Sequence, residues 1–298
     1  MSLEIPLAGP KGEPVDFVRT ILSHGVADLP PGRVDEEAQA YETVVAVPEG
    51  SPRAIRISAS GATAHVEVHG PRLGARASAA VAETVRRILN LDEDLSDFYE
   101  AAADDPELAW ATSGAGRMLR TPTVFEAVVK TVCTTNCAWS ATVRMVTAIV
   151  GNLGEPAAQS DARAFPGADA MAAAPEDFYR DVVRAGYRSA YLRSLAAGVA
   201  DGSVELEELG EPGSGLSDEE VAARLLALPG IGPYGTAHMM MLLGRHSRLV
   251  LDSWTRPKYA RVRGRKATDA QLERRFRRYG SYAGLAFWLY LTRDWVSA

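Results

Sequence analysis

Cysteine is almost absent from this chain of 298 residues, which has only Cys133 and Cys137. The two stand four positions apart in an apolar stretch, and this spacing on one helix is poor for a disulfide. We interpret them as reduced, structural thiols. An iron–sulfur cluster would need four cysteines near the C-terminus, and none is there, so we predict no such cluster and no required cofactor. Spacings typical of metal ligands are also missing, so we predict no metal site built from His, Cys and Asp.

Long apolar runs are missing as well. No stretch approaches the roughly 20 residues that span a bilayer. The start, MSLEIPLAGPKGEP, lacks the order of basic and then apolar residues that marks a signal peptide. We therefore expect no membrane contact and a cytoplasmic protein, associated with the nucleoid if the source is bacterial.

The formal net charge of −6 argues against a nucleic-acid partner only until its distribution is considered. From Gly244 to the end, 13 Lys and Arg stand against 4 Asp and Glu, a local charge of +9. The basic residues form two clusters, at 256–266 and 274–278. Such clusters favour contacts with phosphates, although a solvated helix face is the alternative.

The pattern of apolar residues changes along the chain. The first hundred residues combine a short helix at 16–25, alternating segments at 42–49, 53–61 and 63–70, and a helix at 78–91. From Thr121 the period is 3.6, with one or two helices at 123–150 and further helices at 175–186 and 217–228, the last opened by a capping box. We predict an α+β protein, with a small antiparallel sheet domain with helices at 1–105 and a two-part all-helical domain at 106–298.

A glycine-rich turn, LPGIGPY at 228–234, lies between two helical patterns. Gly230 and Gly232 around Ile231 allow a tight backbone turn and close approach of a ligand. The next helix begins with free N–H groups that favour a phosphate, and a monovalent cation could bridge the turn carbonyls to it. An ordinary turn between two helices is the alternative.

Eighteen positions after Tyr234 comes Asp252, in the segment LVLDSWTR. This combination resembles the helix-hairpin-helix (HhH-GPD) DNA glycosylase superfamily, whose signature is a hairpin, a helix and then an aspartate preceded by apolar residues. The likeness extends to the regions 114–154, 186–191 and 282–288, which look like the bacterial 3-methyladenine and the 8-oxoguanine branches. The resemblance implies an enzyme of base excision repair that acts on double-stranded DNA with damaged bases. We infer no obligate protein partner.

The chemistry that the resemblance implies centres on Asp252. Removal of a base passes through a cationic sugar, which a neighbouring carboxylate stabilises. Asp252 could also cap the helix that follows it. Members of the superfamily that nick DNA carry a lysine two positions beyond the second hairpin glycine, where this chain has Tyr234. We therefore predict a monofunctional enzyme that uses water. Tyr234 itself would line the base pocket, with core packing as the alternative.

The resemblance also assigns residues to DNA contact and to a pocket for the flipped base. Asn136 matches an asparagine that contacts the orphaned partner base, with a helix-junction cap as the alternative, and Arg256 and Lys258 would contact phosphates. The predicted pocket residues, each with burial in the core as the alternative, are Trp139, Tyr187, Trp254, Phe287 and Trp288. His238, among methionines, is expected to be a packing residue.

Phe287 stands where the 8-oxoguanine branch has a glutamine that recognises the lesion. Loss of that polar group favours alkylated purines as substrates. The sequence thus predicts a monofunctional DNA glycosylase for alkylated purines. The alternatives are an 8-oxoguanine DNA glycosylase and a non-catalytic lesion-binding protein, against which Asp252 argues.

Overall fold

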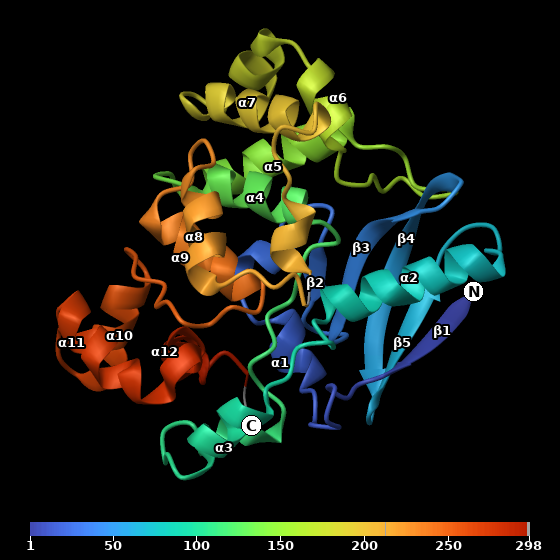
Figure 1. Ribbon diagram of the computed structural model, residues 1–298. Helices are drawn as coiled ribbons and strands as arrows, with labels where there is room; N and C mark the ends of the chain where they lie inside the picture. Colours follow the sequence, from blue (N-terminus) through green and yellow to red (C-terminus); the bar gives the residue numbers. More distant parts are fainter. Residues whose placement is uncertain (212, 297–298) are drawn as a thin grey trace.

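The computed structural model describes residues 1–211 and 213–296 (Figure 1). An antiparallel sheet is followed by a set of helices, which confirms the predicted α+β class. The strands lie in the order β1-β5-β4-β3-β2. Their bounds are β1 Ser2–Pro6, β2 Arg33–Asp35, β3 Ala40–Val47, β4 Gly50–Ser60 and β5 Thr63–Val68.

The sheet buries one face against a long helix and the short helix α1 (Phe17–Ile21). The three predicted strands correspond to β3, β4 and β5, and burial alternates in β4 and β5, where Ile55, Ile57 and Val66 are fully buried. The predicted alternation fails in β3, because both of its faces are covered and Val44 and Val45 are buried in different clusters. Helix α2 (Ala75–Ile88) lies along this face (Figure 1), and it contributes Val81 and Val85, which are spaced by one turn. This apolar stripe holds α2 on the sheet, so the N-terminal part has its own core.

Among the described residues, ten further α-helices surround the second core. They are α3 Ser96–Ala103, α4 Val124–Thr134, α5 Trp139–Leu153, α6 Ala168–Ala173, α7 Arg188–Ala200, α8 Asp218–Leu226, α9 Pro233–Leu242, α10 Thr255–Arg263, α11 Asp269–Phe276 and α12 Ala283–Thr292. The predicted region 123–150 is two helices. The predicted capping box is confirmed, because Ser217 and Glu220 cap each other's backbone at the start of α8. The predicted helix at 175–186 shortens to a π-helical turn, Phe178–Val182.

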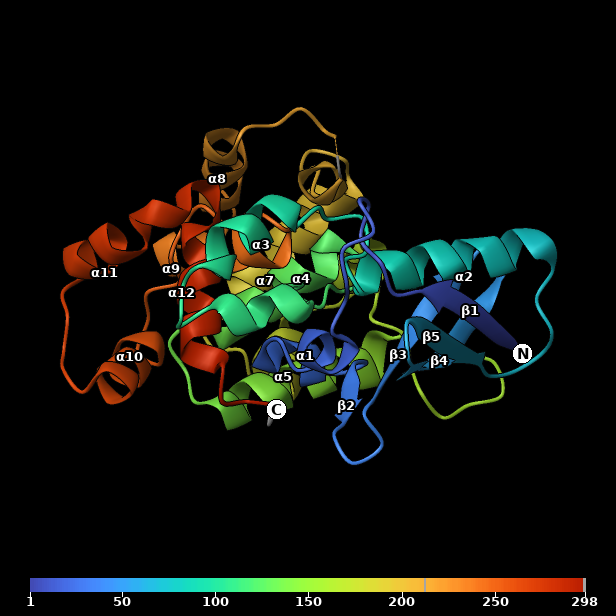
Figure 2. The ribbon, with the colours of Figure 1, turned by 90° about the horizontal axis from the view of Figure 1, so that it is seen from below.

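The helical core joins segments that are far apart in the sequence. Every residue of α12 is buried, and Phe98 of α3, which lies before the predicted boundary at residue 105, packs in the same core. The loop that follows α1 also reaches this core, since Trp288 Nε1 donates to the Ser23 carbonyl at 2.8 Å. Both views show α1 between the sheet and the helices (Figures 1 and 2). No helix of the described residues is long and apolar enough to cross a membrane.

Candidate functional site

The predicted hairpin connects α8 to α9, and its two glycines differ in surroundings. Gly230 has a φ of +82°, and a Cβ there would lie 2.8 Å from Cδ2 of Tyr191. Gly232 is exposed, and a Cβ there would meet no atom within 4 Å. Ile231 is buried and anchors the turn to the helical core. Pro233 begins α9, so the tip of the hairpin presents open backbone beside a helix N-terminus.

Asp252 stands just before α10 and is half-buried. Its Oδ1 accepts hydrogen bonds from the backbone N–H groups of Trp254, at 2.8 Å, and Thr255, at 2.6 Å. In return, the Asp252 N–H donates to Oγ1 of Thr255 at 2.9 Å. The expected capping role is therefore present, and it fixes the carboxylate. Among the described residues Oδ2 has no hydrogen-bond partner, so one oxygen is held and the other remains available.

Tyr234 lies close to this carboxylate. Burial raises the pKa of the Tyr234 phenol, and the charge of Asp252 raises it further. The Thr134 hydroxyl also lies within hydrogen-bonding reach, and it opposes the rise. The hairpin, the end of α4 and the start of α10 thus converge on one place, as the spacing of hairpin and aspartate in the sequence predicts.

Asn136 occupies the junction between α4 and α5 and is exposed. Its φ of 47° lies in the left-handed region, which asparagine tolerates better than most residues. The side-chain amide donates to the Tyr187 hydroxyl at 3.4 Å. Arg188, which is buried, donates to the Thr135 carbonyl and stacks 4.5 Å from the centre of the Tyr187 ring. The exposed Tyr187 therefore belongs to the surface beside Asn136 and is not enclosed.

The predicted pocket aromatics fall into separate groups. Trp254 lies 5.5 Å from Trp288 and 5.6 Å from Trp295, measured between ring centres. Its backbone N–H donates to the Asp252 carboxylate. Trp139 is exposed, and its ring lies 3.7 Å from where a Cβ of Gly25 would be. Trp254 therefore links the carboxylate to the Trp288 and Trp295 rings, Trp288 is almost fully buried, and Trp139 lies in a separate group.

The structure does not bring Phe287 to this group. Its ring is fully buried, 5.3 Å from the ring of Phe276 and 6.4 Å from that of Tyr259. Because α12 is buried on all sides, its sequence has no apolar stripe that indicates which residue faces the site. Phe287 is a core residue in this structure.

The two predicted phosphate contacts are paired with acids. Arg256 is bound through two nitrogens to Asp269, with Nε 2.8 Å from Oδ1. Lys258 Nζ lies 2.7 Å from Oδ2 of Asp294, and its side chain is only 13% exposed. Phosphate would have to compete with these carboxylates for both cations. Arg256 remains half-exposed and is the more accessible of the two.

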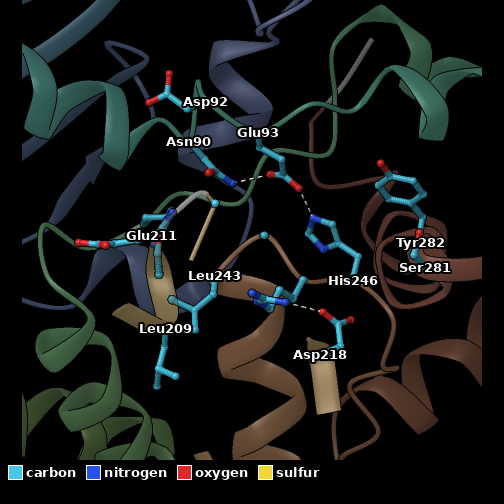
Figure 3. A pocket seen from close by; sticks show the side chains of 15 residues that line it. Asn90, Asp92, Glu93, Leu209, Glu211, Asp218, Leu243, His246, Ser281 and Tyr282 are labelled. Carbon is cyan, nitrogen blue, oxygen red and sulfur yellow. Dashed lines mark hydrogen bonds and ion pairs between the residues drawn. The ribbon is translucent and has the colours of Figure 1, made fainter. Parts of the chain in front are cut away.

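A cleft of about 650 Å³ opens beside the hairpin, with Tyr234, Leu251 and Arg256 in its wall. Another cavity, of about 310 Å³, lies at the opposite end of α9 (Figure 3). His246 and Glu93 are hydrogen-bonded in it, with Nε2 2.5 Å from Oε1, and no predicted site residue lines it. The cleft beside the hairpin is therefore part of the candidate site, and the cavity in Figure 3 is separate from it.

The site includes residues that the sequence did not indicate. The Thr255 hydroxyl accepts the Asp252 N–H, and the Thr134 hydroxyl lies within hydrogen-bonding reach of Tyr234. The Ser23 carbonyl accepts a hydrogen bond from Trp288. Cues were available only for Thr255, since a threonine three positions after an aspartate is typical of a reciprocal cap. Within the described residues, no three His, Cys, Asp or Glu side chains gather in a way that could hold a metal. The predicted monovalent cation would be bound by backbone carbonyls of the hairpin instead.

No protein-family model matches the chain, and no curated protein matches its sequence. Solved structures do match it. The 3-methyladenine DNA-glycosylase from Archaeoglobus fulgidus is 20% identical, with a TM-score of 0.74 over 99% of this chain and 100% of that one. The Clostridium acetobutylicum 8-oxoguanine glycosylase/lyase in its apo-form is 17% identical, with a TM-score of 0.73 over 97% of this chain and 95% of that one.

The same Clostridium enzyme in complex with double-stranded DNA, with cytosine opposite 8-oxoguanine, matches with a TM-score of 0.69 at 17% identity, over 94% of this chain and 92% of that one. At such identities the likeness defines the fold. The chain has the fold of the helix-hairpin-helix (HhH-GPD) DNA glycosylases, and the resemblance noted in the sequence is confirmed at that level.

Proposed function

We propose that this protein is a monofunctional DNA glycosylase that hydrolyses the bond between a damaged, alkylated purine and its deoxyribose in double-stranded DNA. The observation that carries the proposal is the carboxylate of Asp252, held by one oxygen and free at the other, beside a helix-hairpin-helix turn. Glycosylases with the same fold act on 3-methyladenine and on 8-oxoguanine, as their names state.

Asp252 would act by stabilising charge. The sugar becomes an oxocarbenium ion as the base leaves, and a fixed carboxylate close to it gains attraction as this charge develops. The two backbone N–H groups hold the carboxylate before the substrate arrives, and the Thr255 hydroxyl accepts the backbone N–H of Asp252, so little reorganisation is needed. The same free oxygen would orient the water that attacks the sugar.

Lysine chemistry is not available at this site. Tyr234 stands where a Schiff-base lysine would be required, and a phenol cannot form an imine. Lys130 is fully buried and bound to Glu126 and to the Leu29 carbonyl, while Lys258 is paired with Asp294. The enzyme therefore leaves an intact abasic strand.

DNA would bind across the hairpin and the α4–α5 junction. The backbone around Gly230, Ile231 and Gly232 approaches a phosphate, with the predicted monovalent cation as a proposed bridge. Asn136 and Tyr187 protrude together and would occupy the space that the flipped nucleotide leaves.

The test is release of bases from duplexes that each carry one defined lesion, followed by alkali to reveal abasic sites. Asp252→Asn should lower the release rate by at least about a hundredfold, or about 2.7 kcal/mol, and leave DNA binding intact. Release at the wild-type rate by Asp252→Asn would refute the role of the carboxylate. If 8-oxoguanine were preferred, the alternative substrate would replace alkylated purines, and a covalent adduct trapped by borohydride would refute the monofunctional assignment. Binding to lesions without release of any base would indicate the non-catalytic alternative.

A further inference from the structure

Two buried histidines face each other beside Tyr234. His24 follows α1 in the N-terminal part, and His238 lies in α9, one turn after Tyr234. Their ring centres are 6.2 Å apart at 86°, and the His238 ring stacks on that of Tyr234 at 5.9 Å. His24 is 5% exposed and His238 is 4% exposed. The pair thus connects the two parts of the chain behind the hairpin.

Each histidine of the pair has a buried nitrogen without a partner. His24 Nε2 lies 2.7 Å from the Leu119 carbonyl, so this nitrogen carries the proton and donates. In the neutral ring, Nδ1 of His24 is then a lone-pair acceptor, and no described residue bonds to it. Nε2 of His238 also has no partner among the described residues. Buried polar atoms are usually paired, so two unpaired ones in adjacent rings point to a ligand.

Both rings are uncharged at neutral pH. Burial lowers the pKa of His24 to about 3, with smaller contributions from His238 and Lys130. Burial lowers the pKa of His238 to about 4. The pair therefore offers a hydrogen-bond acceptor without a positive charge, and it would not repel a cationic base.

The pair completes a ring of contacts that starts and ends at Asp252. On one side, Asp252 bonds to the backbone of Trp254, whose indole packs on Trp288, which bonds to Ser23 next to His24. On the other side, His238 stacks on Tyr234, and the pKa of the Tyr234 phenol is raised by burial and by the charge of the Asp252 carboxylate. The two histidines and the carboxylate therefore belong to one connected set of residues, in which Tyr234 lies between His238 and Asp252.

We propose that His24 and His238 recognise the edge of the flipped base, and that Nδ1 of His24 selects bases that offer an N–H donor to it. This inference rests on the proposed glycosylase function. Among alkylated adenines, 3-methyladenine keeps its exocyclic amine and is a cation, so it fits an uncharged acceptor. In 1,N6-ethenoadenine the amine nitrogen is closed into a ring and carries no hydrogen. The pair would therefore favour the first base and discriminate against the second.

The experiment compares single-turnover release of 3-methyladenine from methylated DNA with release of 1,N6-ethenoadenine from a duplex. The wild type should release 3-methyladenine faster. His24→Leu should lower that rate about tenfold, the value of one neutral hydrogen bond, and leave ethenoadenine within about twofold. His24→Asn, which keeps a polar group near Nδ1, should recover part of the rate. His238→Leu should also narrow the ratio of the two rates, and His238→Gln should restore it.

His246→Leu is the matched control. His246 is equally buried and also has an unpaired Nδ1, but it lies in the cavity of Figure 3 at the other end of α9. This variant should not change the ratio of the two rates, and melting temperatures identify any variant that fails to fold. An unchanged ratio in folded His24→Leu or, if that variant does not fold, in folded His238→Leu would overturn the histidine assignment alone, as would faster release of ethenoadenine by the wild type. No release of any base by the wild type would overturn the proposed function, and this assignment with it.

Discussion

The two glycines of the hairpin allow stability and DNA contact to be tested separately. In Gly230→Ala, the methyl group meets the Tyr191 ring at 2.8 Å, and the φ of +82° is unfavourable for alanine by about 1–2 kcal/mol. Because Tyr191 is partly exposed and can move, we expect a total loss of about 1–3 kcal/mol in the free energy of unfolding. In Gly232→Ala, the methyl group enters open space at a φ of −102°, so stability should be unchanged or slightly higher.

The effects on DNA binding should run in the opposite order. The methyl group of Gly232→Ala protrudes where a phosphate would approach the backbone, and it should weaken binding about tenfold, as for the loss of one charged hydrogen bond. Folded Gly230→Ala should bind within a few-fold of the wild type, since its methyl group points to Tyr191. Thermal melts and fluorescence anisotropy with a lesion duplex measure the two properties. Wild-type affinity in Gly232→Ala would refute the hairpin as the phosphate contact.

Two further predictions concern positioning and pH. Thr255→Val removes the hydroxyl that accepts the N–H of the aspartate, so the rate of base release should fall about tenfold with little change in DNA affinity, and Thr255→Ser should restore it; equal rates in both variants would contradict this. The free energy of unfolding should fall on acidification, because burial lowers the pKa of His24 and His238 in the folded chain. The unfolded chain therefore takes up protons near pH 6.5 that the folded chain does not. Between pH 6 and pH 5 each histidine should contribute a loss of about 1 kcal/mol. Melts at both pH values should show this loss in the wild type, and a double leucine variant that loses as much would refute the explanation.

Much of the fold could be predicted from local patterns. Strands β4 and β5 alternate because one face is buried, and the capping box of α8 is a local signal. The edge strands could not be predicted in the same way. β2 has only three residues, and β1 pairs with β5, so its position depends on a partner far along the chain. Such pairings leave little trace in a short segment of sequence.

Within the site, the sequence indicated the residues that belong to one continuous motif. The hairpin, Tyr234 and Asp252 are separated by a single helix, so their spacing determines that they meet. His24 was not indicated, because its position depends on how the loop after α1 packs on α9. Phe287 was assigned to the pocket from a short match, and in a helix buried on all sides such a match cannot define the facing side.

The net charge of the C-terminal region, counted from the sequence, overstates the number of basic side chains that are free to bind DNA. The local charge of +9 suggests a broad basic surface, yet Arg275 and Arg278 bind the acids Glu107 and Asp105 of the segment before α4. Lys258 is similarly paired with Asp294. Part of the basic excess therefore joins segments within the fold. A DNA-binding surface here must depend on the remaining exposed cations and on the backbone N–H groups of the hairpin, which explains how a protein with a net charge of −6 could still bind DNA.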